Sequence, residues 1–182
     1  ILPQGSYFLT DTYVSDDPSA QEIVETTTLA AEGVRAFGIE PKIALLSHSD
    51  FGNADSASAQ KMREAVAILQ RQHPDLEVEG EMHADAALNE DIRQRVFPNS
   101  KLKGSANLLV MPTLDAGNIT MNSLKILGEG LPVGPMLLGS ARPAHILTPS
   151  VTSRGVVNMT AIAVLDAQRQ AAARRAQERA EG

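Results

Sequence analysis

Short apolar runs alternate with longer helical patterns along most of the chain, and this alternation limits the fold more than any other feature. The predicted strands are residues 5–14, 42–47, 76–82, 108–111 and 133–138. Between them, apolar residues recur at spacings of three and four, as on one face of a helix. Strands that alternate with helices form right-handed β-α-β crossovers. The sequence therefore predicts an α/β fold, a three-layer α/β/α sandwich around a mostly parallel sheet.

The boundaries of several elements can also be predicted. Ser19 and Glu22 have the spacing of a capping box at a helix start. Residues 84–96 are predicted as one helix, and the uninterrupted apolar run 108–111 as a central strand with both faces covered. One long helix is expected from residue 152 onward. Its inward face should hold Val156, Thr160, Ala163 and Ala167.

Composition excludes several classes of function. The chain has 182 residues, of which 43% are hydrophobic, so a sizeable core is expected. Its net charge of −6 argues against nucleic acid and anionic membranes as partners, and no apolar run is long enough to span a membrane. The absence of cysteine excludes disulfides and is compatible with the cytoplasm. A start at Ile1 without an initiator methionine is expected of a piece of a longer protein.

Two polar segments are candidate functional sites. The run Ser47-His48-Ser49-Asp50 follows a predicted strand, where ligands of parallel sheets bind. It could hold a nucleophile and a base, but adjacent residues do not form a triad, so a ligand-binding or capping loop is favoured. Arg154 lies in the first turn of the last helix, where a guanidinium suits a phosphate. A solvated Arg154 is an equally good interpretation.

Metal and dinucleotide sites are not supported by the sequence. His83-x-Asp85 has the residue types of a metal site, but a polar pair at a helix start is the better interpretation. The glycines Gly128, Gly130 and Gly134 have the wrong spacing for a dinucleotide fingerprint, and they follow a helix instead of opening one. We therefore expect no cofactor and no metal in this chain.

Four stretches, in this order, resemble the signatures of the phosphate acetyl/butyryltransferase family. They are Ala44–Ser49, Gly80–Leu88, Ala106–Ile119 and Gly134–Gly139. The resemblance runs from about Gly5 to Gln168. It implies a phosphotransacetylase-like and isocitrate dehydrogenase-like fold. It also implies that residues 1–150 are the second of two domains, the one through which the family dimerises, and that residues 151–182 form a returning C-terminal helix and a polar tail.

The same resemblance bears on catalysis. Family transferases carry a Ser-Arg-Gly motif after the last signature and a catalytic aspartate five residues later. Here Thr148-Pro149-Ser150 stands in place of that motif, and Gly155 in place of the aspartate. We therefore expect no catalytic residues in this chain.

This degraded version is similar to the C-terminal domain of bacterial hybrid NADP-dependent malic enzymes. That resemblance implies a non-catalytic regulatory and dimerisation domain, with acetyl-CoA as its effector. NADP and a divalent metal would belong to an upstream malic-enzyme domain absent from this chain. The implied acyl-CoA or phosphate site is formed by Ser47, His48, Ser49, Asn118 and Arg154.

Two rival functions remain. An active phosphate acetyltransferase would need a base for the CoA thiol and donors for the tetrahedral oxyanion. Pro149 and Gly155 argue against it. A dehydrogenase half of the isocitrate dehydrogenase kind would need a cluster of aspartates for a metal, and the sequence has none of suitable spacing.

Overall fold

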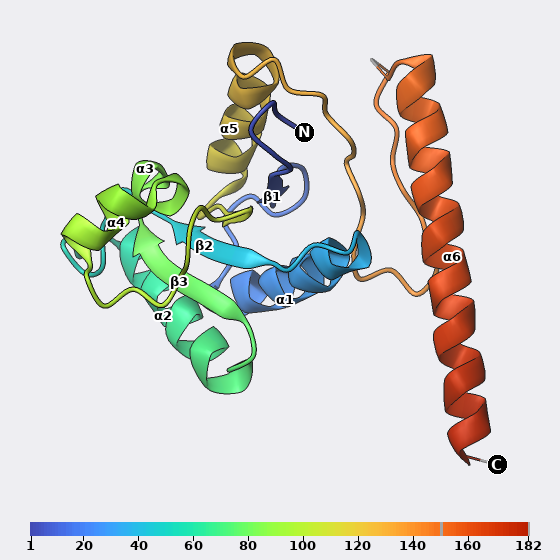
Figure 1. Ribbon diagram of the computed structural model, residues 1–182, viewed down its shortest axis with the longest axis horizontal. Coiled ribbons are helices and arrows are strands. Elements are labelled where there is room, and N and C mark those ends of the chain that lie inside the picture. Colours follow the sequence, from blue (N-terminus) through green and yellow to red (C-terminus); the bar gives the residue numbers. More distant parts are fainter. Residues whose placement is uncertain (150, 182) are drawn as a thin grey trace. The chain divides into compact units, whose positions relative to one another are not determined.

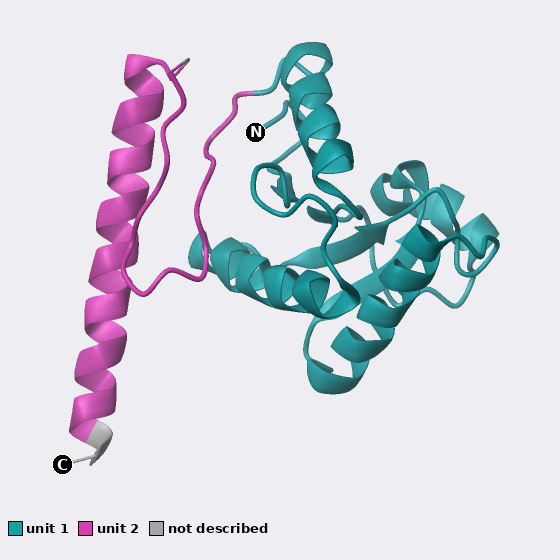
Figure 2. Cartoon of the chain, turned by 180° about the vertical axis from the view of Figure 1, so that it is seen from behind, with its two compact units in different colours: residues 1–130 teal, residues 131–182 magenta. Residues whose placement is uncertain are grey.

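The computed structural model describes residues 1–149 and 151–181, which divide into two compact units. The first unit is Ile1–Gly130 and the second is Leu131–Gly182 (Figure 2). The division lies earlier in the chain than the boundary at residue 150 that the sequence suggested. No helix of the described residues is long and apolar enough to cross a membrane.

The first unit is built on a four-stranded parallel sheet (Figure 1). Its strands are β1 (Phe8–Thr10), β2 (Lys42–Leu46), β3 (Glu77–Met82) and β4 (Leu108–Val110), and their order is β1-β4-β2-β3. All three residues of β4 are buried between neighbouring strands, so the prediction of a central, covered strand at 108–111 is confirmed.

Helices cover both faces of this sheet. On one face, α1 (Ala20–Ala36) and α2 (Ala57–Gln72) bury a cluster that includes Ile23, Val34 and Leu69 against β2, β3 and β4. On the other face, side chains of α3 (Ala84–Leu88), α4 (Glu90–Val96) and α5 (Leu114–Leu127) pack against a second cluster around Met82 and Leu109. The predicted α/β/α sandwich is thus confirmed.

Local side-chain chemistry sets the helix starts. Ser19 and Glu22 form the predicted capping box of α1, in which each side chain binds the other's backbone N–H. The hydrogen bond from the Ser19 backbone N–H, together with that from its hydroxyl, lowers the pKa of Glu22. The single helix expected over residues 84–96 is wrong, because Asn89 ends α3 and its side chain caps the N–H of Ile92 at the start of α4.

The second unit consists of an extended segment that returns along one long helix, α6 (Ser153–Glu181) (Figures 1 and 2). His145 of the segment has Nδ1 3.3 Å from the Leu137 backbone nitrogen, and its Nε2 lies 3.2 Å from Asp166 of α6. The strand predicted at residues 133–138 does not form, because its unit has no other described strand with which it could pair.

The predicted inward face of α6 is also wrong. Val156, Thr160 and Ala167 are exposed and Ala163 is half-buried, whereas Met159 and Ile162 are buried. The sequence prediction assumed that α6 packs on a sheet. In its own unit the helix packs against a single extended segment, which covers a narrower stripe of side chains.

Candidate functional site

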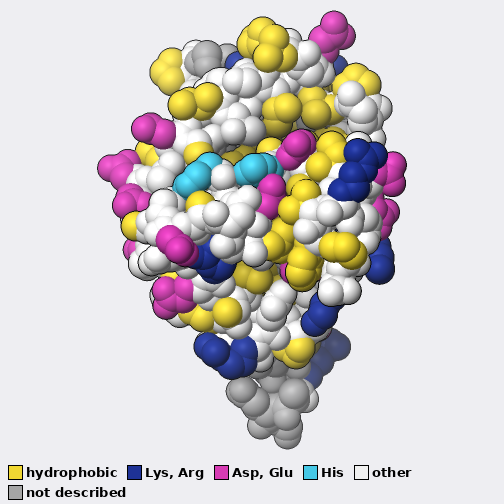
Figure 3. Space-filling model, turned by 90° about the vertical axis from the view of Figure 1, so that its left-hand side faces the viewer, with side chains coloured by type: hydrophobic (Ala, Val, Ile, Leu, Met, Phe, Trp, Pro, Cys, Tyr) yellow, Lys and Arg dark blue, Asp and Glu magenta, His cyan; other side chains and the backbone are white. Residues whose placement is uncertain are grey.

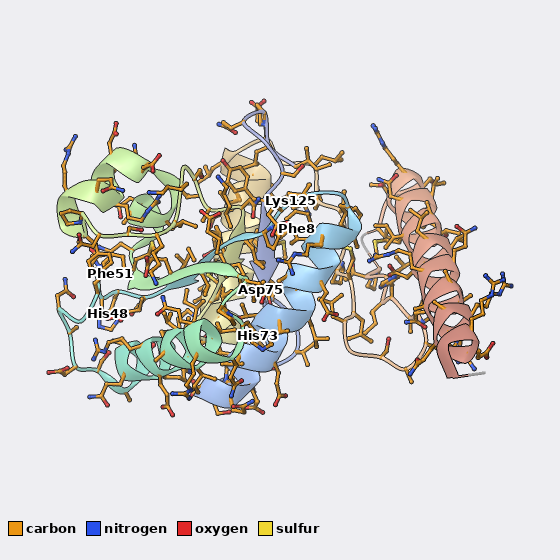
Figure 4. All side chains as sticks on the ribbon, turned by 60° about the horizontal axis from the view of Figure 1, so that its bottom comes forward. Phe8, His48, Phe51, His73, Asp75 and Lys125 are labelled. Carbon is orange, nitrogen blue, oxygen red and sulfur yellow. The ribbon has the colours of Figure 1, made fainter. Side chains whose placement is uncertain are left out.

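The sequence-predicted site residues of the first unit lie beyond the carboxyl ends of the parallel strands. His48 and Phe51 belong to the loop of residues 47–56, which joins β2 to α2, and Figure 4 shows both at the end of α2 opposite to His73. The helix after β2 lies on one face of the sheet, and the helices after β3 and β4 lie on the other. Loops therefore diverge at this edge, which is where α/β sheets bind ligands.

Loop 47–56 exposes some of its predicted site residues and buries another. The side chain of His48 is exposed, with Nε2 3.3 Å from the hydroxyl of Ser56, the N-cap of α2. Ser47 is half-buried and accepts the backbone N–H of Ser49. Ser49 itself is fully buried, and its hydroxyl donates to a carboxylate inside the protein, where it holds the loop.

The partner of Ser49 is Glu81, a fully buried carboxylate at the end of β3. One of its oxygens, Oε1, accepts three donors: the Ser49 hydroxyl at 2.6 Å, the Gly52 N–H at 2.9 Å and the Arg63 guanidinium at 2.8 Å. Ser49 Oγ in turn accepts the N–H of Ala54 at 3.1 Å. A buried charge with these partners ties the middle of the loop to the sheet.

Arg63 of α2 supplies the counter-charge for this carboxylate. Its guanidinium also donates to the carbonyl of Ala54 at 2.9 Å and to Asp55 at 3.2 Å. Its planar fork of donors suits several acceptors at once, so one side chain joins α2, the loop and β3.

The start of the loop is fastened from the other side by Asp50 and His83. Asp50 accepts the backbone N–H of His83 at 2.7 Å, and its second oxygen lies 2.9 Å from Nδ1 of the same residue. His83 Nε2 lies 2.8 Å from the carbonyl oxygen of His48, and because that oxygen can only accept, Nε2 is the donor. Figure 3 shows histidine side chains side by side on this face, among acidic and apolar groups.

Asn118 lies near the start of α5 and is committed to backbone contacts. Its side-chain amide donates to the carbonyl of Thr12 at 3.2 Å, and the Asn122 amide donates to the backbone carbonyl oxygen and to the side-chain Oδ1 of Asn118. The helix can approach the segment after β1 this closely because residue 117 is glycine. A β-carbon there would lie only 2.1 Å from the carbonyl oxygen of Asp11.

The remaining predicted site residue, Arg154, belongs to the second unit. It lies in the first turn of α6 and is exposed, and its guanidinium makes no hydrogen bond or ion pair with the residues that the structure describes. Pro149 and Gly155, which the sequence resemblance placed at the family's catalytic positions, are both described, whereas Ser150 lies outside the described residues.

Two further possibilities for the site can be tested against the geometry. Among the described residues, no cluster of three histidines or acids could hold a metal ion, and His83 binds Asp50 instead of forming a site with Asp85. A small cavity at the carboxyl ends, lined by residues that include Asp11, Ile23 and Met111, has room for about one water molecule, far less than a nucleotide needs.

Glu81, Arg63 and the bond between Asp50 and His83 were not predicted as parts of the site. The available signal was Glu81 itself, because an acidic residue in a strand that should be covered on both faces needs a buried partner. The partner could not be named from the sequence, since Arg63 lies on a different element and several other basic residues were equally available.

In sequence, the chain is similar to malic enzymes. It is 60% identical over 166 residues to an NAD-dependent malic enzyme of Rhizobium meliloti, covering 91% of this chain and 22% of that protein. It is 53% identical to an NADP-dependent malic enzyme of Escherichia coli, covering 93% of this chain and again 22% of the relative. The chain thus spans about a fifth of the length of the malic enzymes that it matches.

The fold matches solved phosphotransacetylases. A crystal structure of a phosphotransacetylase from Streptococcus pyogenes superposes with a TM-score of 0.86 at 33% identity, covering 90% of this chain and 50% of that one. The sequence model described as phosphate acetyl/butaryl transferase matches residues 1–164, which include the sheet, the loop 47–56 and most of the apolar part of α6. The chain therefore belongs to the phosphate acetyl/butaryl transferase family.

Proposed function

We propose that this chain is a regulatory and dimerisation domain of a malic enzyme, that it responds to acetyl-CoA, and that it transfers no acyl group itself. The parent protein would decarboxylate malate to pyruvate in the cytoplasm. Its nicotinamide cofactor, for which we propose NADP, and its divalent metal would bind upstream of this chain. The observation that carries the proposal is the high identity to malic enzymes of which the chain matches only 22%.

The substituted catalytic positions support the non-transferring part of the proposal. A transferase needs a cation for the phosphoryl group and a group that activates the CoA thiol. In this chain Pro149 and Gly155 stand at those positions, and neither side chain can donate, accept or carry a charge. The alternative, an active phosphate acetyltransferase, is favoured by the match to the phosphotransacetylase structure.

The ligand site that we propose in the first unit is formed by Ser47, His48 and Asn118, with Ser49 in a supporting position. In the second unit, we propose Arg154 as a contact for a phosphate group. CoA carries several phosphate charges, whereas the chain has a net charge of −6, so binding requires a local group of donors. Arg154 is suited to this role because it is exposed and has no partner among the described residues.

We also propose that the chain forms a homodimer through its first unit. Helix α5 exposes Ile119 by 64%, Ile126 by 72% and Leu127 by 85%, an apolar surface that association would bury. A specific interface should bury at least about 1,000 Å² in total. Light scattering at micromolar concentration should give twice the mass of one chain, and a monomer would contradict this proposal.

The second unit fits the returning C-terminal segment of the family, and we propose that it packs against the upstream domain. Residues 133–138 have the pattern of a strand but no strand partner in their own unit. Helix α6 exposes Val157, Val164 and Leu165 by half or more of their surface. Both features would be explained by contacts with a part of the protein outside this chain.

Titration calorimetry with acetyl-CoA tests the proposed site. The full-length protein should bind, and Arg154→Ala should weaken binding about 10- to 100-fold, because a hydrogen bond to a charged group contributes about 1.5–3 kcal/mol. Arg174→Ala, which removes an exposed arginine farther along α6, is the matched control and should bind normally. Equal affinities for wild type and Arg154→Ala would remove Arg154 from the site, and a full-length wild type that does not bind would overturn the proposal.

A further inference from the structure

Loop 47–56 has a conformation that its own sequence does not favour. Phe51 has a φ of 48°, in the left-handed region, and Gly52 follows with a φ of 94°. A side chain other than glycine in that region costs about 1–2 kcal/mol, so the surroundings must hold it there. The ring of Phe51 stacks on Phe97 with centroids 4.3 Å apart, but a ring contact does not determine the path of the backbone on either side.

The central turn of the loop is held by Glu81. Its carbonyl accepts the N–H of Phe51 at 2.7 Å, and its carboxylate accepts the N–H of Gly52 at 2.9 Å. Through the Ser49 hydroxyl the same carboxylate orients the acceptor of the Ala54 N–H. Glu81 thus holds the turn at residues 49–52, while Arg63 binds the carbonyl of Ala54 at the approach to α2.

The attachment to Glu81 determines which side chains of the loop are buried and which are exposed. Ser49 is buried on the side of Glu81, while His48 next to it is exposed. Displacement of Ser49 would therefore move His48 and Ser47, because they are joined to it by the backbone. Arg63 neutralises the carboxylate from α2, so the charge of Glu81 is balanced without a ligand.

We propose that Glu81 is a positioning residue, whose buried carboxylate holds loop 47–56 in the conformation that presents Ser47 and His48 to a ligand. The part of this inference that concerns a ligand rests on the proposed function. The part that concerns the loop rests on the contacts above.

The chain contains a matched control on the same strand. Glu79 is 5% exposed, and its carboxylate accepts the backbone N–H of Lys101 at 2.9 Å, far along the chain from the loop. Glu79→Gln and Glu81→Gln each remove one buried negative charge from β3. A role in stability alone predicts similar effects of the two substitutions, and a positioning role predicts different ones.

Hydrogen exchange and acetyl-CoA titration of the full-length protein distinguish these outcomes. Glu81→Gln should speed amide exchange in peptides covering residues 47–56 and weaken acetyl-CoA binding about 10-fold, the scale on which supporting side chains act. Glu79→Gln should leave both unchanged. Wild-type exchange in the loop of Glu81→Gln, or an equal increase in both variants, would overturn the inference.

Two additional results distinguish the role of Glu81 in the loop from the proposed binding of acetyl-CoA. If Glu81→Gln does not fold, Ser49→Ala removes one donor and leaves the pair of Glu81 with Arg63, and faster exchange of the Ala54 region is then expected. Unchanged exchange there would overturn the inference. If wild type does not bind acetyl-CoA, the proposed function fails, and the exchange data alone decide the role of Glu81.

Discussion

Replacing Arg93 by methionine is expected to lower the free energy of unfolding by about 3–5 kcal/mol, because it leaves several buried carbonyls without their donor and each such acceptor costs about 1–3 kcal/mol. The Arg93 side chain is fully buried, and its guanidinium donates to the carbonyls of Ala86, Ala87, Leu102 and Gly104 at 2.6 to 3.4 Å. Two of these carbonyls belong to α3, whose end needs donors, and two lie in the segment that leads to β4.

The nearest acid does not substitute for these contacts. Glu90 lies 4.0 Å from the Arg93 guanidinium and is 42% exposed, so the charge depends mainly on the carbonyls. Urea denaturation followed by circular dichroism measures the loss. Arg95→Met, on the exposed side of the same helix, is the control and should change stability by no more than about 0.5 kcal/mol. Equal denaturation midpoints for the two variants would show that the carbonyls find other donors.

The full-length protein is expected to show no transfer of an acetyl group from acetyl phosphate to CoA. Loss of one group that stabilises the developing charge lowers a rate by about 10²–10³, so the loss of two predicts a rate about 10⁴–10⁶ below that of a working transferase. The resemblance places Pro149 and Gly155 at the two positions concerned.

A coupled assay for acetyl-CoA, with an active phosphotransacetylase as positive control, measures this rate. Turnover above the buffer blank that disappears in Arg154→Ala would show that Ser153-Arg154-Gly155 is the functional motif, and the rival function would then hold. Turnover that persists in Arg154→Ala would indicate a contaminating enzyme, which repurification would remove.

The fold could be predicted from the sequence where an apolar pattern has only one structural explanation. The run 108–111 is apolar without interruption because both faces of β4 are covered, and it was correctly placed at the centre. Residues 133–138 have a similar pattern, but a strand requires a second strand, and none is described in their unit. The helix break at Asn89 was missed because asparagine both ends one helix and caps the next, with no glycine or proline to mark it.

The candidate site was predictable only in its location. A polar loop after a predicted strand located residues 47–50 at the correct edge of the sheet. Which of these residues face solvent could not be read from the sequence, because it depends on Glu81 and Arg63, which lie on neighbouring elements. The burial of Ser49 and the exposure of His48 next to it are consequences of those contacts.

The proposed function as a whole is tested most directly by the malate-decarboxylating activity of the full-length protein, measured as a function of acetyl-CoA concentration. Regulation through this chain predicts that acetyl-CoA changes kcat or KM for malate, and that Arg154→Ala shifts this response to about 10- to 100-fold higher acetyl-CoA concentrations. A rate of malate decarboxylation that is independent of acetyl-CoA up to saturation would contradict a regulatory role for this chain.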